Sequence, residues 1–228
     1  MAITTCVFDA YGTLFDVAAA ARQAAAEPEF SAIKDSWPSL AEHWRLKQLQ
    51  YTWLRAIAGA HEDFWVVTQE GLDWALEKSG HMGDPALRER LLALYWELQS
   101  YPEVPQMLHR LKDAGLKTAI LSNGSSDMLA GAVKSAGIAD VLDDTLSVEA
   151  VGVFKPDARV YDLVSKRFGC AKNEVLFVSS NGWDVGCATG YGFETVWVNR
   201  AGDPVDRLPW QPKYTLPDLT RIPELAGV

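Results

Sequence analysis

The sequence predicts an α/β fold in which a doubly wound parallel sheet carries an inserted, all-helical cap domain. Two observations lead to this prediction. Short hydrophobic runs alternate with amphipathic stretches of helical period, which is typical of parallel strands joined by helices. A long segment after the first run lacks β-branched runs and is helical in pattern throughout. With 228 residues, the chain is long enough for a core domain and a smaller insertion.

Five hydrophobic runs are predicted to form the strands of the sheet. They are residues 4–8, 117–125, 144–148, 174–181 and 194–199. Helices are expected between them at residues 104–114, 127–136, 157–168 and 184–189, most of them ending at a glycine: Gly115, Gly137, Gly169 or Gly190. Strands that alternate with helices in this way form a Rossmann-like sheet with helices on both faces.

The segment from residue 16 to residue 101 is rich in Ala, Leu, Trp and charged residues and reads as helix. Ser39 and Glu42 form a capping-box pattern that predicts a helix through about Ala58, and Asp84 before a proline predicts another helix start. Two prolines, at positions 102 and 105, favour an extended connection at the end of the segment. We therefore expect a core domain of residues 1–15 and 103–228 and a cap domain of residues 16–102.

Composition and charge exclude several classes of partner. The chain is 48% hydrophobic and 22% charged with a formal charge of −9, so nucleic acid and anionic membrane surfaces are unfavourable partners. The three cysteines have no paired spacing, and we expect free thiols rather than disulfides or a zinc site. No run approaches the length of a membrane span, and the N-terminal sequence has no signal-peptide pattern, so a cytoplasmic location is expected.

Polar residues gather where four of the predicted runs end. The first is followed by Asp9 and the glycine and threonine after it, the second by Ser122, Asn123 and Gly124, the third by Lys155, and the fourth by the stretch from Ser179 to Asp184. Each group alone is compatible with a turn, a cap or a solvated side chain. Because ligands of parallel α/β sheets bind beyond the carboxyl ends of the strands, the four together predict a functional site.

Five stretches of the sequence resemble the L-2-haloacid dehalogenase branch of the haloacid dehalogenase superfamily. They are FDAYGTLFD (residues 8–16), WRLKQLQYTWLR (44–55), LSNG (121–124), FKPDARVY (154–161) and FVSSNGWD (177–184). The resemblance covers nearly the whole chain. It implies hydrolysis of the C2 carbon–halogen bond of short 2-haloalkanoic acids through an aspartyl ester, with inversion at C2. It also implies a homodimer without a cofactor or a metal.

The resemblance assigns a role to each matching residue. Asp9 is the expected nucleophile, and Lys155 is the cation that keeps it ionised. Thr13, Ser179 and Asn181 are expected to orient these two, and Asp184 to activate water. Ser122 and backbone amides would hold the substrate carboxylate, while Arg45 and Asn123 would receive the halide. The further substrate-binding residues that the resemblance implies are Tyr11, Phe64, Tyr161 and Trp183.

Tyr11 is the most discriminating of these positions. Phosphatases of the superfamily place a second Asp there to protonate an alkoxide leaving group. A halide leaves without a proton, so an aromatic side chain suits a carbon–halogen bond, and a magnesium ion is less needed. A packing role for Tyr11 remains the alternative.

Arg45 recurs with Leu49 and Trp53 at four-residue spacing, which places its guanidinium on an apolar, inward face of the cap helix. The alternative is an arginine whose stem covers apolar surface while its head reaches water. Two rival functions also remain open from the sequence. One is a magnesium-dependent phosphatase of the same fold, which shares Asp9, Thr13 and Lys155, and the other is a catalytically silent binding protein.

Overall fold

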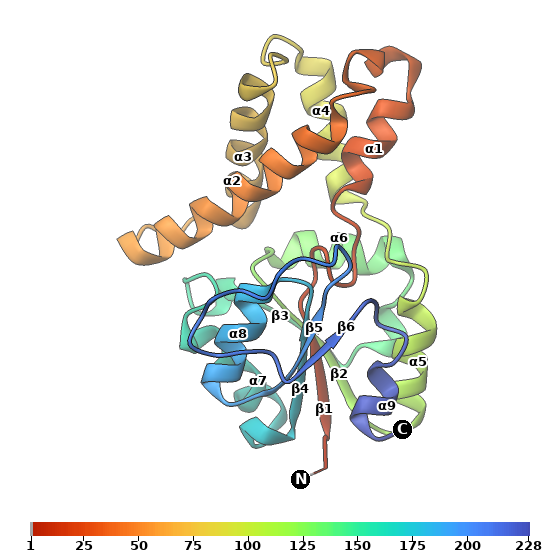
Figure 1. Cartoon of the computed structure of the whole chain (residues 1–228), viewed down its shortest axis with the longest axis vertical. Coiled ribbons are helices and arrows are strands. Elements are labelled where there is room, and N and C mark those ends of the chain that lie inside the picture. The colour runs from red at the N-terminus through yellow and green to blue at the C-terminus, as the bar shows by residue number, and fades with distance from the viewer. Residues whose placement is uncertain (1) are drawn as a thin grey trace.

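The computed structural model describes residues 2–228 and has a parallel sheet below a group of helices (Figure 1). The sheet has six strands in the order β3-β2-β1-β4-β5-β6, and every neighbouring pair is parallel. The strands are β1 (Thr5–Phe8), β2 (Lys117–Ser122), β3 (Asp144–Ser147), β4 (Val175–Ser179), β5 (Glu194–Val198) and β6 (Tyr214–Leu216). The order reverses at β1, because β2 and β3 lie on one side of it and β4 to β6 on the other. This reversal confirms the doubly wound class predicted from the sequence.

The central strands form because their side chains are buried on both faces. All four residues of β1 and all five of β4 are buried, as expected for a sheet covered by helices on each side. The five predicted strands are present, although β2 ends at Ser122 and β5 at Val198, earlier than predicted. The sixth strand, β6, was not predicted from the sequence.

Helices of the core domain cover the two faces of this sheet. Figure 1 shows α5 and α9 on one side of the strands and α7 and α8 on the other. The helices are α5 (Val104–Asp113), α6 (Ser126–Ala136), α7 (Ala158–Phe168), α8 (Gly182–Tyr191) and α9 (Ile222–Ala226), with short 3₁₀ turns at Ala139–Val141, Val148–Ala150 and Lys172–Glu174. The predicted glycine stop at Gly190 is wrong. Helix α8 continues past it to Gly192, where φ is 115°, a conformation that only glycine adopts easily.

Four helices form the cap. They are α1 (Ala19–Ala26), α2 (Trp37–Ala58), α3 (Phe64–Lys78) and α4 (Pro85–Trp96), and a 3₁₀ helix at Pro28–Ile33 follows α1. Asp84 caps α4 as predicted, since its side chain accepts a hydrogen bond from the Leu87 N–H. The predicted start of α2 is wrong, because the helix begins at Trp37 and the Ser39 hydroxyl donates to the Ser36 carbonyl instead of capping it.

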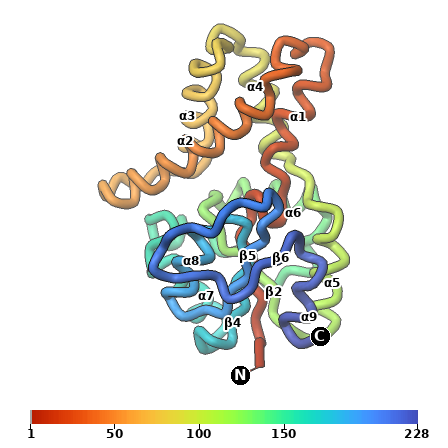
Figure 2. The backbone as a smooth tube through the Cα atoms, in the orientation of Figure 1, coloured from red at the N-terminus to blue at the C-terminus, as the bar shows by residue number. Residues whose placement is uncertain are grey.

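The chain enters and leaves the cap at neighbouring points. The Asp16 N–H donates to the Gln99 carbonyl over 3.0 Å, and the Tyr101 N–H donates to the Leu14 carbonyl over 2.9 Å. Figure 2 shows these two crossings close together between the lower and upper parts of the tube. The division into a core of residues 1–15 and 103–228 and a cap of residues 16–102 stays a prediction.

Candidate active site

The ends of β1, β2 and β4 lie side by side, so the residues that follow them share one edge of the sheet. Phe8 pairs with Ile120 on one side and Val178 on the other. Asp9 therefore leaves the sheet between the end of β2, at Ser122, and the end of β4, at Ser179. This arrangement confirms that the predicted polar strand ends converge.

The Asp9 carboxylate is held by three donors from different parts of the core. Thr13 Oγ1 and Asn181 Nδ2 each donate to Oδ2 over 3.0 Å, and Lys155 Nζ donates to Oδ1 over 3.1 Å. Asp9 is only 6% exposed, so these donors replace most of its hydration. The carboxylate is thus largely removed from water and fixed in direction by its three donors.

Lys155 bridges two carboxylates in the interior. Its Nζ lies 3.1 Å from Asp9 and 2.9 Å from Asp184, and both Lys155 and Asp184 are fully buried. Burial alone would lower the pKa of the Lys155 ammonium, but Asp184 and Asp9 outweigh it and raise that pKa. Burial raises the pKa of the Asp184 carboxyl above its usual value, although Lys155 opposes the shift. Asp184 is consequently a stronger base than an exposed aspartate.

Tyr161 lies next to Asp184 in the interior of the core. Its hydroxyl donates to Asp184 Oδ1 over 2.7 Å, and its ring is buried against Phe177, Tyr191 and Phe193. The sequence comparison grouped Tyr161 with the substrate-binding residues. In the structure it contacts Asp184, so it can act on the reaction by fixing that carboxylate.

Arg45 is the cap side chain that reaches the core site. From α2, its Nη2 donates to Asn181 Oδ1 over 2.7 Å, while the Nδ2 of the same amide donates to Asp9. The guanidinium passes directly over Gly12, where a Cβ atom would lie 2.8 Å from both Nη1 and Nη2. The inward orientation predicted for Arg45 is therefore correct, and Gly12 leaves the space that it occupies.

Aromatic rings cover the side of Asp9 that faces the cap. Tyr11 is stacked on Tyr95 of α4 with 5.7 Å between ring centroids, and it lies 5.8 Å from Phe64 at the start of α3. Burial raises the pKa of the Tyr11 hydroxyl well above its ordinary value, so it remains neutral. A Cβ at Gly124 would lie 2.7 Å from the Tyr11 ring, so only glycine fits at this position. These contacts give Asp9 an apolar lid.

Ser122 and Asn123 lie at the end of β2, next to this lid, and both are buried. The Ser122 hydroxyl accepts from the Gly124 N–H over 3.0 Å, which leaves its own hydrogen available. The Asn123 carbonyl oxygen accepts from the Lys155 N–H, which directs the amide Nδ2 away from that contact. Among residues 2–228, the N–H groups of Ala10 and Tyr11 donate to no backbone carbonyl. These groups are suited to a small anion.

Trp183 lies in the first turn of α8 and packs edge-on against Trp53 of the cap, with 5.3 Å between ring centroids. Its indole Nε1 is buried and has no hydrogen-bond partner within residues 2–228. The inward direction of Trp53, predicted from its four-residue spacing to Arg45, agrees with this contact. Trp183 therefore forms part of the junction between cap and core.

Three residues of the site were missed by sequence reasoning. Ser180, whose N–H donates to Thr13 Oγ1 over 2.8 Å, and Gly12 both lie inside motifs whose other members were selected. Their position in the sequence, between residues that were selected, could have identified them. Tyr95 had no such signal, because an aromatic on an amphipathic helix is most often core.

The donor set around Asp9 does not fit a magnesium ion. The Lys155 ammonium lies between the carboxylates of Asp9 and Asp184 and supplies a positive charge to both. Within residues 2–228 there is no group of three or more Asp, Glu, His or Cys side chains that could hold a metal.

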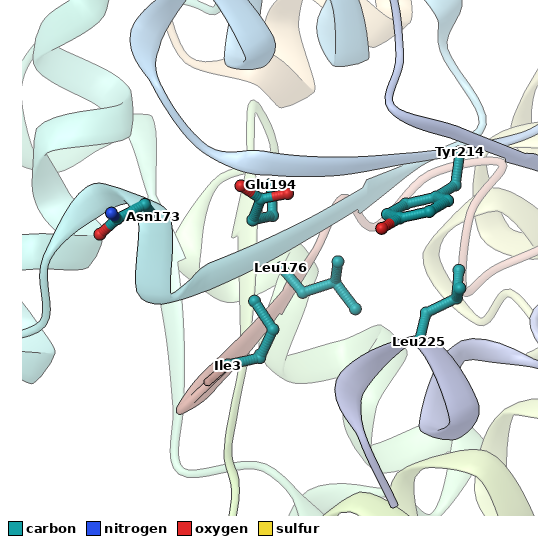
Figure 3. A pocket seen from close by; sticks show the side chains of 6 residues that line it. All are labelled: Ile3, Asn173, Leu176, Glu194, Tyr214 and Leu225. Carbon is teal, nitrogen blue, oxygen red and sulfur yellow. The ribbon is translucent and has the colours of Figure 1, made fainter. Parts of the chain in front are cut away.

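A second cavity lies at the opposite edge of the sheet. It has a volume of about 240 Å³ and is lined by Ile3, Asn173, Leu176, Glu194, Tyr214 and Leu225 (Figure 3). Three of these residues lie near the starts of β4, β5 and β6, and the others precede β1, lie in the 3₁₀ turn before β4 or belong to α9. None was selected from the sequence. Across residues 2–228, no helix has the length and apolarity needed to cross a membrane. Cys6, Cys170 and Cys187 are free thiols, as expected.

Known proteins resemble this chain over almost its full length. A family model described as haloacid dehalogenase-like hydrolase matches residues 3–190. The (S)-2-haloacid dehalogenase 1 of Pseudomonas sp. (strain CBS-3) is 42% identical over 98% of this chain and 96% of that protein. The (S)-2-haloacid dehalogenase 4A of Burkholderia cepacia is 44% identical over 89% and 85%, respectively.

Solved structures that resemble this chain include members of the same family. The L-2-haloacid dehalogenase from Xanthobacter autotrophicus, solved with chloropropionic acid covalently bound, has a TM-score of 0.86 and 37% identity over 98% of both chains. That structure contains a covalent adduct, and the present chain has a desolvated, oriented carboxylate at Asp9. The chain belongs to the haloacid dehalogenase-like hydrolases and, among them, to the (S)-2-haloacid dehalogenase family.

Proposed function

We propose that this protein hydrolyses the C2 carbon–halogen bond of short (S)-2-haloalkanoic acids to (R)-2-hydroxy acids and halide. The observation that supports this most directly is the position of Asp9. Its carboxylate is buried, is held by Lys155, Thr13 and Asn181, and is covered by the Tyr11 ring with no acidic side chain in that place. A buried, fixed carboxylate is a suitable nucleophile for a saturated carbon.

In the first displacement, Asp9 attacks C2 from the face opposite the halogen and forms an ester. Ser122 and the free amides near Tyr11 hold the substrate carboxylate, and the halide departs toward Arg45 and Asn123. The site already contains two carboxylates, Asp9 and Asp184, and two cations, Lys155 and Arg45, so their charges cancel. The substrate carboxylate is therefore bound by neutral donors, which hold it without retaining the product strongly.

In the second displacement, water attacks the ester carbonyl of Asp9, so C2 is inverted only once. Asp184 accepts the proton, and burial favours this role because it raises the pKa of that carboxyl. Tyr161 keeps Asp184 directed toward Lys155. Lys155 and Asn181 hold the carboxylate that is restored when the ester is cleaved. Ser179 supports this arrangement, since its hydroxyl accepts the Asn181 N–H over 3.1 Å.

The rival phosphatase function is opposed by Tyr11. Tyr11 occupies the position of the second Asp that a phosphatase uses as an acid, and burial keeps the Tyr11 hydroxyl neutral by raising its pKa. A silent binding protein would not require a buried carboxylate–ammonium–carboxylate arrangement, which is costly to desolvate.

One comparison of substrates tests the proposal. The protein is incubated with L-2-chloropropionate or with p-nitrophenyl phosphate, each with and without EDTA, and chloride and phosphate are measured. We expect chloride release that EDTA does not reduce, D-lactate as the product, and no phosphate. Phosphate release that depends on magnesium would support the phosphatase instead, and no release of either ion would support the binding protein.

We also propose that the protein is a cytoplasmic homodimer. The outer face of α2 supports a partner surface, because Leu46, Leu54 and Ile57 are 56%, 55% and 87% exposed. Light scattering after gel filtration should give twice the mass of one chain. Ile57→Glu should shift the mass toward that of a single chain, whereas a single-chain mass for the unmodified protein would contradict the dimer.

A further inference from the structure

A buried polar cluster in the cap lies directly behind Arg45. Gln48 of α2 donates through Nε2 to Thr68 Oγ1 over 2.7 Å and to the Tyr95 hydroxyl over 3.1 Å. Thr68 in turn donates to the Phe64 carbonyl over 2.7 Å. All three polar side chains are buried, so the cluster joins α2, α3 and α4 through hydrogen bonds and not only through apolar packing.

Tyr95 connects this cluster to the active site. Its ring is stacked on the Tyr11 ring, with 5.7 Å between the centroids, and its centroid lies 4.8 Å from that of the Trp44 ring. Burial raises the pKa of the Tyr95 hydroxyl to about 12, so it remains a neutral hydrogen-bonding group at any pH at which the enzyme would work. A tyrosine at this place therefore offers both an apolar face to Tyr11 and a hydroxyl to the cap.

A small cavity separates the cluster from Arg45. It has a volume of about 10 Å³ and is lined by Arg45, Gln48 and Tyr95 together with Val17, Ala41 and Trp44. A cavity of about 10–15 Å³ accommodates one water molecule when two or more polar groups face it. Gln48 Oε1 has a lone pair to spare, because within the described part of the chain it accepts one hydrogen bond, from the Tyr95 hydroxyl over 3.3 Å.

The guanidinium of Arg45 has donors available for this cavity. Within residues 2–228 it makes a single hydrogen bond, from Nη2 to Asn181. An arginine presents five N–H donors in a fixed plane, so one hydrogen bond fixes its position but leaves the plane free to rotate. A second anchor on the cap side is needed to hold the plane toward a departing halide.

We propose that Gln48 and Tyr95 are positioning residues, which hold the Arg45 guanidinium toward the leaving halide through one water bound in the cavity between them. The water accepts a hydrogen bond from Arg45 and donates to Gln48 Oε1 and the Tyr95 oxygen. This inference rests on the proposed function, in which Arg45 receives the halide.

The inference predicts an effect that depends on the halogen. The value of kcat/KM reports steps up to the irreversible loss of halide, and chloride is a poorer leaving group than bromide. A misplaced guanidinium therefore slows a chloro substrate more than a bromo substrate. A general loosening of the cap would slow both by the same factor.

The test compares Tyr95→Phe and Gln48→Met with the unmodified protein on L-2-chloropropionate and L-2-bromopropionate. A hydrogen bond to a charged group corresponds to roughly a tenfold change, so we expect kcat/KM for the chloro acid to fall about tenfold and that for the bromo acid clearly less. Thr52→Val is the matched control. It removes a buried hydroxyl of the same helix that donates to the Leu49 carbonyl, and it should leave the ratio of kcat/KM for the two substrates unchanged.

A double-variant cycle decides whether Tyr95 acts through Arg45. In an Arg45→Lys background, Tyr95→Phe should change kcat/KM little, because the planar group that it positions is gone. An unchanged chloro-to-bromo ratio in both single variants, or equal losses together with a lower melting temperature, would overturn the inference. If the unmodified protein released neither chloride nor bromide, the proposed function would be wrong. That result differs from an unchanged chloro-to-bromo ratio, which would contradict this inference alone.

Discussion

The core and the cap hold their functional side chains by different means. In the core, Asp9 receives three hydrogen bonds from three separate segments, so the loss of one donor leaves two. In the cap, one helix supplies Arg45, whose single hydrogen bond among residues 2–228 goes to the core residue Asn181. The nucleophile is therefore fixed by the sheet itself, whereas the group that faces the leaving halide depends on how the cap is docked.

The largest effect is expected from the core. Asp9→Asn should lower kcat by about four orders of magnitude or more, because a neutral amide is a poor nucleophile at saturated carbon. Chloride release measured with an ion electrode checks this, and Asp140→Asn, an exposed aspartate, serves as the control.

Isotope labelling shows which atom water attacks. In one turnover with excess enzyme in H₂¹⁸O, the label should enter the Asp9 carboxylate and not the 2-hydroxy acid. Label that appears first in the hydroxy acid would make Asp9 a general base and water the nucleophile at C2.

A smaller effect is expected from the cap. Arg45→Ala should lower kcat/KM by about two orders of magnitude, the usual effect of removing one preorganised charge-stabilising donor. Arg45→Lys should recover little, since an ammonium lacks the planar fork. Lys47→Ala, on the same helix but with an exposed amine that donates to Gln50, should behave like the unmodified protein. Normal turnover in Arg45→Ala would mean that Arg45 only covers apolar surface.

A substitution at the surface where core and cap meet should lower kcat/KM less than Arg45→Ala does. Gly124→Ala places a methyl group 2.7 Å from the Tyr11 ring, which must move toward Tyr95 and Phe64. We expect about 1–3 kcal/mol less stability from this overpacking and roughly a tenfold lower kcat/KM. Gly83→Ala, which meets no atom within 4 Å, is the control in thermal and kinetic assays. Equal behaviour of the two variants would show that the Tyr11 ring has room to move.

The smallest effect concerns the pH dependence of ester hydrolysis. Asp184 must be ionised to accept a proton, so kcat should fall as the pH falls through its raised pKa. The hydrogen bond from Tyr161 favours the charged carboxylate and lowers this pKa. Tyr161→Phe should therefore move the acid limb of the pH–kcat profile to higher pH. An unchanged limb would assign that limb to another group.

The difference between core and cap also explains which features could be predicted from the sequence. Asp9, Lys155 and Asp184 follow hydrophobic runs, and parallel strands bring their carboxyl ends to one edge without any knowledge of side-chain packing. Strand β6 was missed because only three residues, Tyr214–Leu216, form it and only the last is buried. Such a short edge strand lacks the hydrophobic pattern that identifies the central ones.

In the cap, helical spacing predicted the direction of Arg45 but not its neighbours. Tyr95 lies on a different helix, and its contact with Tyr11 depends on how α4 packs against α2. The capping pattern at Ser39 failed because the chain offered a competing start, with Pro38 in the first turn after Trp37. Packing between helices and competition between helix starts are tertiary effects that local sequence does not contain.

The adjacent crossings between core and cap make the cap an exchangeable part. Leu14 and Tyr101 are hydrogen-bonded to each other across 2.9 Å, although 86 residues separate them in the chain. Any folded unit whose two ends lie equally close could be grafted at this point without rethreading a strand of the sheet. Asp9 and Lys155 lie below the junction, whereas Arg45, which faces the departing halide, lies above it. Recombination at this one site could therefore change the substrate while the nucleophile stays in place.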